Sequence, residues 1–148
     1  GLTRRGVYIW RCDLETVTLT KPNGEVIARP KVLRRWWERA RGFMFRRELE
    51  PGEALLFVNP RETIADAGIH MLFVGMPLGV VWFDSGGRVV DTVLAQPWRM
   101  HYAPRLPAQY ILEGAPQLLK SLTLNTKATL LPSNAGVDQT ASELIRQI

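Results

Sequence analysis

Apolar and polar positions along this 148-residue chain predict a series of short β-strands. The most apolar central stretch, residues 69–84, is interrupted by two glycines and a proline, and it is shorter than a bilayer-spanning helix requires. We expect two strands here, joined by a bend at residues 75–77, with residues 78–83 covered on both faces. A glycine-rich turn then leads into residues 88–94, which predicts a β-hairpin.

The rest of the chain shows the same pattern with one clear change of period. Alternation and turn residues predict further strands at residues 7–12, 15–20, 25–28, 54–58, 109–113 and 127–131. Apolar residues recur at three and four positions over residues 32–44, which predicts an amphipathic helix. Residues 114–121 are expected to form a turn and a short helix, and residues 138–148 a terminal helix. The segments 61–68 and 96–107 are expected to be loops.

These elements predict a mainly β (α+β) fold. We expect a compact single domain over residues 1–132, built as a barrel- or sandwich-like antiparallel sheet with two or three short helices. Residues 133–148 are expected to be a C-terminal linker followed by a short helix.

Charge is concentrated in one part of the chain. The formal net charge is +5, and the basic residues cluster between residues 29 and 47, where Glu38 is the one acid. The expected helix at 31–41 therefore predicts an anionic-surface site, for nucleic acid or lipid headgroups, formed by Arg34, Arg35, Arg39 and Arg41. The alternative is a solvated helix whose arginines pair with the glutamates at 48, 50 and 53.

Cysteine content and the first residues restrict the chemistry only slightly. The single cysteine, Cys12, excludes an intramolecular disulfide and a thiolate zinc cage within the chain. The given sequence contains no transmembrane segment and begins with Gly1. We therefore expect either a cytoplasmic protein or an exported one whose signal segment is absent from this sequence.

The candidate ligand-binding groups lie near residue 70 and in the loop 96–107. We expect a cleft for a small polar ligand or a glycan, formed by aromatic, imidazole, guanidinium and carboxyl groups: His70, Trp98, His101, Tyr102, Arg105 and Glu113. Two histidines and a carboxylate are also a recognised metal-binding set, but no pair has helical ligand spacing. We therefore predict no catalytic residue, metal or cofactor, and keep a metal-dependent enzyme as an alternative.

Several motifs occur in an order that resembles a known family. They are residues 41–45 (RGFMF), 55–57 (LLF), 69–84, 87–90 (GRVV) and 110–113 (YILE), and their order is similar to that of the Domain of Unknown Function 192 family, or uncharacterised protein family 0127. The resemblance covers residues 26–131. It implies a compact β-rich domain and no established reaction, and some members look exported or membrane-tethered. The chain departs from the family at Gly79, where members commonly have an acid.

The leading hypothesis from the sequence is a non-catalytic binding or accessory domain. Its ligand cleft would lie near His70 and the loop 96–107. Binding to an anionic surface through residues 31–41 is the second hypothesis, and a metal-dependent enzyme is the third.

Overall fold

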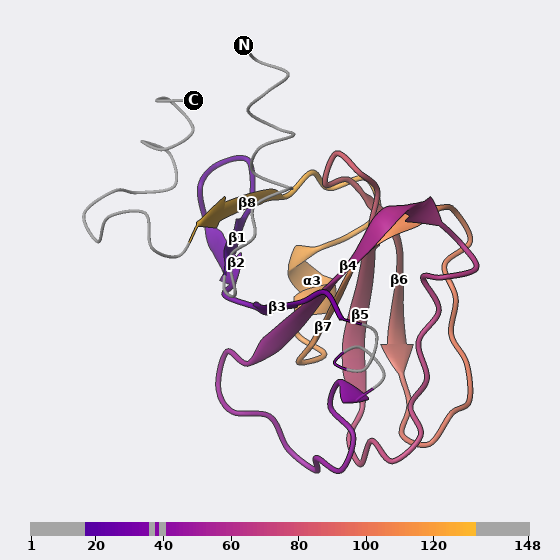
Figure 1. The fold of residues 1–148 in the computed structure, drawn as a ribbon. Coiled ribbons are helices and arrows are strands. Elements are labelled where there is room, and N and C mark those ends of the chain that lie inside the picture. Colours follow the sequence, from indigo (N-terminus) through magenta and orange to yellow (C-terminus); the bar gives the residue numbers. More distant parts are fainter. Residues whose placement is uncertain (1–16, 36–37, 39–40, 133–148) are drawn as a thin grey trace.

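Two β-sheets make up the part of the chain that the computed structural model describes, residues 17–35, 38 and 41–132 (Figure 1). The smaller sheet has the order β2-β1-β8, formed by Val26–Ala28, Val17–Thr20 and Thr129–Pro132. The larger has the order β3-β4-β7-β5-β6, formed by Lys31–Leu33, Ala54–Thr63, Ala108–Gly114, Leu78–Phe83 and Val89–Ala95. A short helix, α3 (Leu118–Ser121), follows β7.

The strand pattern and turn residues explain most of these elements. β5 is buried along its whole length and pairs with β6 across the 84–87 turn, which confirms the hairpin prediction. The oxygen Oδ1 of Asp84 accepts hydrogen bonds from the backbone N–H groups of Gly86 and Arg88, at 2.9 Å each. Gly87 has φ +87°, which a residue with a side chain adopts only with strain. The hairpin is therefore encoded locally.

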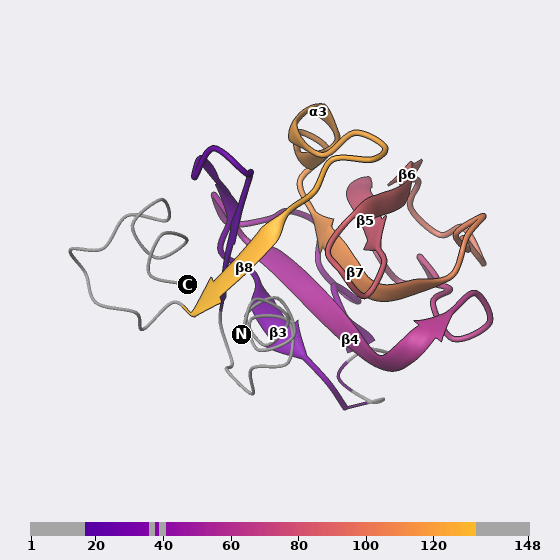
Figure 2. The same ribbon diagram turned by 90° about the horizontal axis from the view of Figure 1, so that it is seen from above.

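β7 is the central strand of the larger sheet and pairs antiparallel with both β4 and β5. Side chains of successive residues point to opposite faces, so Leu112 and Ile111 contribute to different hydrophobic clusters. One cluster joins the larger sheet to the smaller one and includes Leu19 and Leu130. The other lies under the loops that contain Phe43 and residues 67–76. The fold is mainly β and sandwich-like, as predicted (Figure 2).

The predicted helix at 32–44 is wrong in its first turn. Lys31–Leu33 is instead strand β3, which pairs parallel to β4 with Leu33 opposite Phe57. Without β3, one edge of β4 would leave its backbone N–H and C=O groups unpaired. Pairing with β3 satisfies these groups and buries the side chain of Leu33. Glu38 and Arg41 are helical.

The stretch 69–77 also differs from the expected strand. Ile69 forms one isolated bridge with Tyr102, and the residues that follow it form turns. β4 continues to Thr63, into the segment expected to be a loop. The predicted strand at 7–12 and terminal helix at 138–148, with Cys12, lie outside the described residues. Among the described residues no helix is long and apolar enough to cross a membrane.

Candidate functional site

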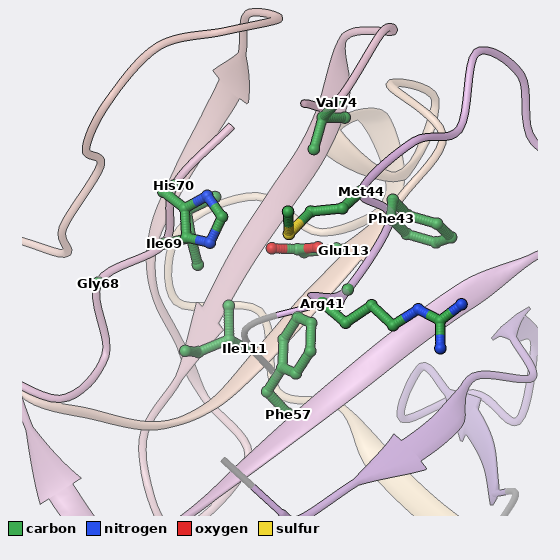
Figure 3. A pocket seen from close by; sticks show the side chains of 11 residues that line it. Arg41, Phe43, Met44, Phe57, Gly68, Ile69, His70, Val74, Ile111 and Glu113 are labelled. Atoms are coloured by element: carbon green, nitrogen blue, oxygen red, sulfur yellow. The ribbon is translucent and has the colours of Figure 1, made fainter. Parts of the chain in front are cut away.

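A cavity of about 210 Å³ lies on the face of the larger sheet that the loops cover (Figure 3). Its floor is formed by Phe57 of β4 and by Ile111 and Glu113 of β7. Residues 41–44 form one wall, and residues 68–70 with Val74 form another. The cavity is therefore built from four segments that are far apart in the sequence.

Glu113 is the most unusual residue of this cavity. It sits on the central strand opposite Leu55 of β4 and Val80 of β5, and only 5% of its surface is exposed. Burial raises the pKa of the Glu113 carboxyl to about 8. At neutral pH the carboxyl is therefore mainly protonated, so it can donate a hydrogen bond as well as accept one.

His70 reaches the same cavity from the loop that follows Ile69. Two hydrogen bonds join Ile69 and Tyr102, from each backbone N–H to the other carbonyl, at 2.8 and 2.9 Å. The N–H of Met71 donates to the carbonyl of Arg99 at 2.8 Å. These bonds fix the backbone on both sides of His70. Figure 3 shows its imidazole and the Glu113 carboxyl facing the same space.

The wall at 41–44 is a tight turn. Gly42 has φ +41°, and the N–H of Met44 donates to the carbonyl of Arg41 at 2.7 Å. This turn directs the ring of Phe43 into the core, where it is buried. In Figure 3 the Arg41 guanidinium points away from the Glu113 carboxyl. Burial alone accounts for the raised pKa of Glu113, with no compensating charge from the described residues.

The predicted ligand-binding residues separate into five places. His70 and Glu113 line the cavity. The ring of His101 packs against Gly68, because a Cβ built on that glycine would lie 2.5 Å from Cε1 of the imidazole. Tyr102 is half-buried, and its hydroxyl accepts a hydrogen bond from the N–H of Gln96 at 3.0 Å.

Arg105 and Trp98 lie away from the cavity lining. Arg105 is bound to Asp91, with 3.1 Å between its guanidinium and Oδ1 and 2.9 Å between its backbone N–H and Oδ2. Burial raises the pKa of Asp91, but the hydrogen bonds from Arg105 outweigh it and hold that pKa below its usual value. Trp98 is exposed and contacts Phe73.

The structure describes three of the four predicted anionic-surface residues. Arg34 and Arg35 are exposed, Arg41 lines the cavity, and Arg39 lies outside the described residues. Arg46, which follows the expected helix, pairs with Glu53, with 2.6 Å between its guanidinium and Oε1.

Sequence reasoning missed the apolar walls of the cavity. Phe43, Phe57 and Ile111 read as ordinary core residues, because alternation indicates burial and says nothing about an empty space. One signal was available: a glutamate continues the buried register of residues 109–113, where a charged side chain is unfavourable. In the described part of the chain, no group of three or more His, Cys, Asp or Glu residues is placed to hold a metal ion.

Comparison with known proteins places this architecture in a family. The model of the family DUF192, described as an uncharacterized ACR, matches residues 18–130. A UPF0127 protein of Thermococcus kodakarensis is 45% identical over 85 residues, which is 57% of this chain and 52% of that protein. A UPF0127 protein of Pyrococcus furiosus is 39% identical over 83 residues, 56% of this chain and 68% of that protein. The match thus spans about half the length of the Thermococcus relative.

Two crystal structures share the fold. One is a Sinorhizobium meliloti protein labelled a candidate transcription regulator, with a TM-score of 0.66 and 23% identity over 78% of this chain and 91% of that chain. The other is a Novosphingobium aromaticivorans protein of unknown function, with a TM-score of 0.63 and 23% identity over 78% of this chain and 82% of that chain. At this identity the likeness concerns the fold alone.

Proposed function

The chain belongs to the DUF192 family of uncharacterized proteins. Within this family assignment, we propose that the cavity of this protein binds a small amine-bearing molecule non-covalently. The protein would act as a binding or accessory domain. Glu113 would bind the ammonium group. His70 would supply a second hydrogen-bonding group from the wall formed by residues 68–70.

The observation that carries the proposal is the buried Glu113 carboxyl at the floor of a cavity. Burying an ionisable group without a partner is unfavourable, and the cost falls when a ligand brings the opposite charge to it. A cation from a ligand would restore the ionised carboxylate. A buried ionisable group that destabilises the folded protein when the cavity is empty, and destabilises it less when a ligand is bound, is typical of a binding site.

The shape and lining of the cavity suggest what else the ligand contains. Apolar side chains, among them Phe43, Phe57 and Ile111, surround the carboxyl. A volume of about 210 Å³ is below the usual range for drug-sized ligands, which is roughly 300–1,000 Å³. The proposed ligand is therefore a short aliphatic or small aromatic amine.

Butylamine is a suitable first probe, with butanol and butyrate as neutral and anionic controls of matched size. Titration followed by amide chemical shifts should move the resonances of Ile69, His70, Ile111 and Glu113 most strongly with butylamine. The Glu113→Gln variant should bind butylamine about tenfold more weakly, since it loses a charge-assisted hydrogen bond. A Glu62→Gln variant, which alters an exposed carboxyl, should bind as the wild type does.

The pH dependence of butylamine binding separates this mechanism from nonspecific contact. Below pH 8 the empty site holds a protonated Glu113, so binding an ammonium releases one proton. The dissociation constant should fall about tenfold from pH 6 to pH 7 and level off near pH 8. Equal affinities for butylamine and butyrate, or an unchanged affinity in Glu113→Gln, would remove the proposal.

A further inference from the structure

Three aromatic side chains from three separate loops form a cluster on the surface, outside the cavity. Phe45, Phe73 and Trp98 are 73%, 44% and 59% exposed, and Met100 beside them in sequence is 69% exposed. The ring centroids of Phe45 and Phe73 are 5.3 Å apart, and those of Phe73 and Trp98 are 5.1 Å apart. We call these three residues the aromatic cluster. Contiguous exposed apolar groups of this kind mark interaction surfaces.

The backbone of the aromatic cluster is held in an unfavourable conformation. Phe45, Phe73 and Trp98 have φ of +66°, +61° and +66°. The other non-glycine residue with positive φ in the described part of the chain is Asn125, a residue type that tolerates this region. Bulky residues remain in such a conformation when the surroundings impose it, commonly at functional sites.

Backbone hydrogen bonds between the loops impose this conformation. The N–H of Phe45 donates to the carbonyl of Phe73 at 2.6 Å. The N–H of Trp98 donates to the carbonyl of Met71 at 2.8 Å. In Figure 1 the three loops meet at one end of the larger sheet, below β5 and β6. The cluster is therefore pre-organised, and a partner would not need to order it.

Ring geometry favours one kind of partner. The interplanar angles are 32° between Phe45 and Phe73 and 62° between Phe73 and Trp98. Rings tilted in this way do not form a flat platform on which a sugar or a base could stack. They form a protruding apolar wedge, which suits insertion between lipid headgroups.

The charges of the three loops complement an anionic surface. Residues 69–77 and 96–105 contain no acid. Arg99 is exposed and lies in sequence between the exposed Trp98 and Met100. The segment 42–48 contains Arg46, which is paired with Glu53, together with exposed Arg47 and exposed Glu48. Arginines beside inserted aromatic rings are typical of contacts with lipid phosphates.

We propose that the aromatic cluster docks this protein on an anionic lipid bilayer. The three rings enter the headgroup region, and Arg47 and Arg99 face the lipid phosphates. This surface differs from the predicted basic helix at 31–41, and the proposal is independent of the cavity and its ligand.

Co-sedimentation with phosphatidylcholine vesicles, with and without phosphatidylglycerol, tests the proposal. The triple variant Phe45→Asn/Phe73→Asn/Trp98→Asn removes the rings, and asparagine tolerates positive φ, so the fold is retained. Its melting temperature should equal or exceed that of the wild type. Binding to vesicles with phosphatidylglycerol should fall at least about tenfold in this variant.

Three further variants separate the contribution of the rings from that of the arginines. Leu124→Asn removes an exposed apolar side chain from another loop and should bind vesicles as the wild type does. Arg47→Gln and Arg99→Gln should each reduce the preference for phosphatidylglycerol by about fivefold.

Three results would overturn the proposal. The first is wild-type protein that sediments with neither vesicle type. The second is a folded triple variant that binds as the wild type does. The third is wild-type self-association that the triple variant abolishes without any vesicle binding, which would make the cluster a contact between two copies of the chain.

Discussion

Replacing Glu113 by glutamine should stabilise the protein strongly at neutral pH and only slightly at pH 5. Burial raises the pKa of this carboxyl from 4.5 to about 8. An acid with a raised folded-state pKa favours folding at low pH, and this contribution is lost as the pH rises from 4.5 to 8. Glutamine has a similar shape and does not ionise.

The magnitude follows from the size of the pKa shift. One pKa unit corresponds to about 1.4 kcal/mol. At pH 7 the wild type should therefore lose about 3 kcal/mol relative to a fully protonated Glu113, and the loss should approach about 5 kcal/mol above pH 8. Such a penalty is a large fraction of the stability of a typical domain, which is about 5–15 kcal/mol.

Urea unfolding of both proteins at pH 5, 6, 7 and 8 measures this difference. The unfolding free energy of Glu113→Gln minus that of the wild type should grow by about 2.5 kcal/mol between pH 5 and pH 7. Groups common to both proteins cancel in the difference. Parallel pH profiles for the two proteins would refute the burial argument.

Glu62→Gln provides the control for this measurement. The backbone N–H of Ser85 donates to the Glu62 carboxylate at 2.7 Å and lowers the pKa of Glu62. The stabilising contribution of Glu62 is therefore complete above pH 4.5 and is lost as the pH falls. Its variant should differ from the wild type by a constant amount from pH 5 to pH 8.

Four other substitutions test packing and hydrogen bonding away from the cavity lining. Gly79→Asp should destabilise the protein by about 1–3 kcal/mol, because a Cβ there would lie 2.7 Å from the carbonyl oxygen of Ala115. In Gly86→Ala the new Cβ would lie 3.5 Å from Oδ1 of Asp84, an ordinary contact, so the melting temperature should change little. Equal destabilisation by Gly79→Asp and Gly86→Ala would contradict this account. Asp91→Asn should cost about 1–2 kcal/mol in urea unfolding, since it weakens the bonds to Arg105. Arg105→Ala should cost less than Asp91→Asn, because the backbone N–H of residue 105 still donates to the carboxylate.

Gly79 packs closely against the chain segment that follows β7. Gly79 lies opposite Gly114 on β7, and residues 115–116 pass directly over its Cα. A side chain at this position would require the 115–116 segment to move. The glycine and the chain path after β7 therefore fit one another in this protein.

Local elements were predictable from the sequence because their causes are local. The hairpin of β5 and β6 is encoded by an apolar run, a turn with Asp84 and Gly87, and a second β-branched run. The first hairpin, β1 and β2, has the same kind of turn, in which Asn23 accepts a hydrogen bond from the N–H of Glu25 at 2.9 Å. The short helix α3 and the last strand β8 also lie where they were expected.

Elements whose causes lie far away in the chain were not predictable. Val32 and Leu33 belong to an apolar pattern over residues 32–44 that suits a helix. In the structure they form a strand instead, because their backbone pairs with the edge of β4. His70 and Trp98 were expected in one cleft, yet two backbone hydrogen bonds turn the loops so that the tryptophan faces outward with Phe73. Tertiary contacts outweigh local propensity in both places.

The sequence by itself determined most of the strands, the turns and the alternation that places Glu113 on a buried face, because these depend on neighbouring residues. Only the tertiary structure decided that loops at 41–44 and 68–74 leave a cavity above that glutamate, and that three loops bring their aromatic rings together. The alternation of apolar and polar residues predicts which face of a strand each side chain occupies. What covers that face depends on segments distant in sequence, whose positions are set by backbone pairing and packing over the whole molecule.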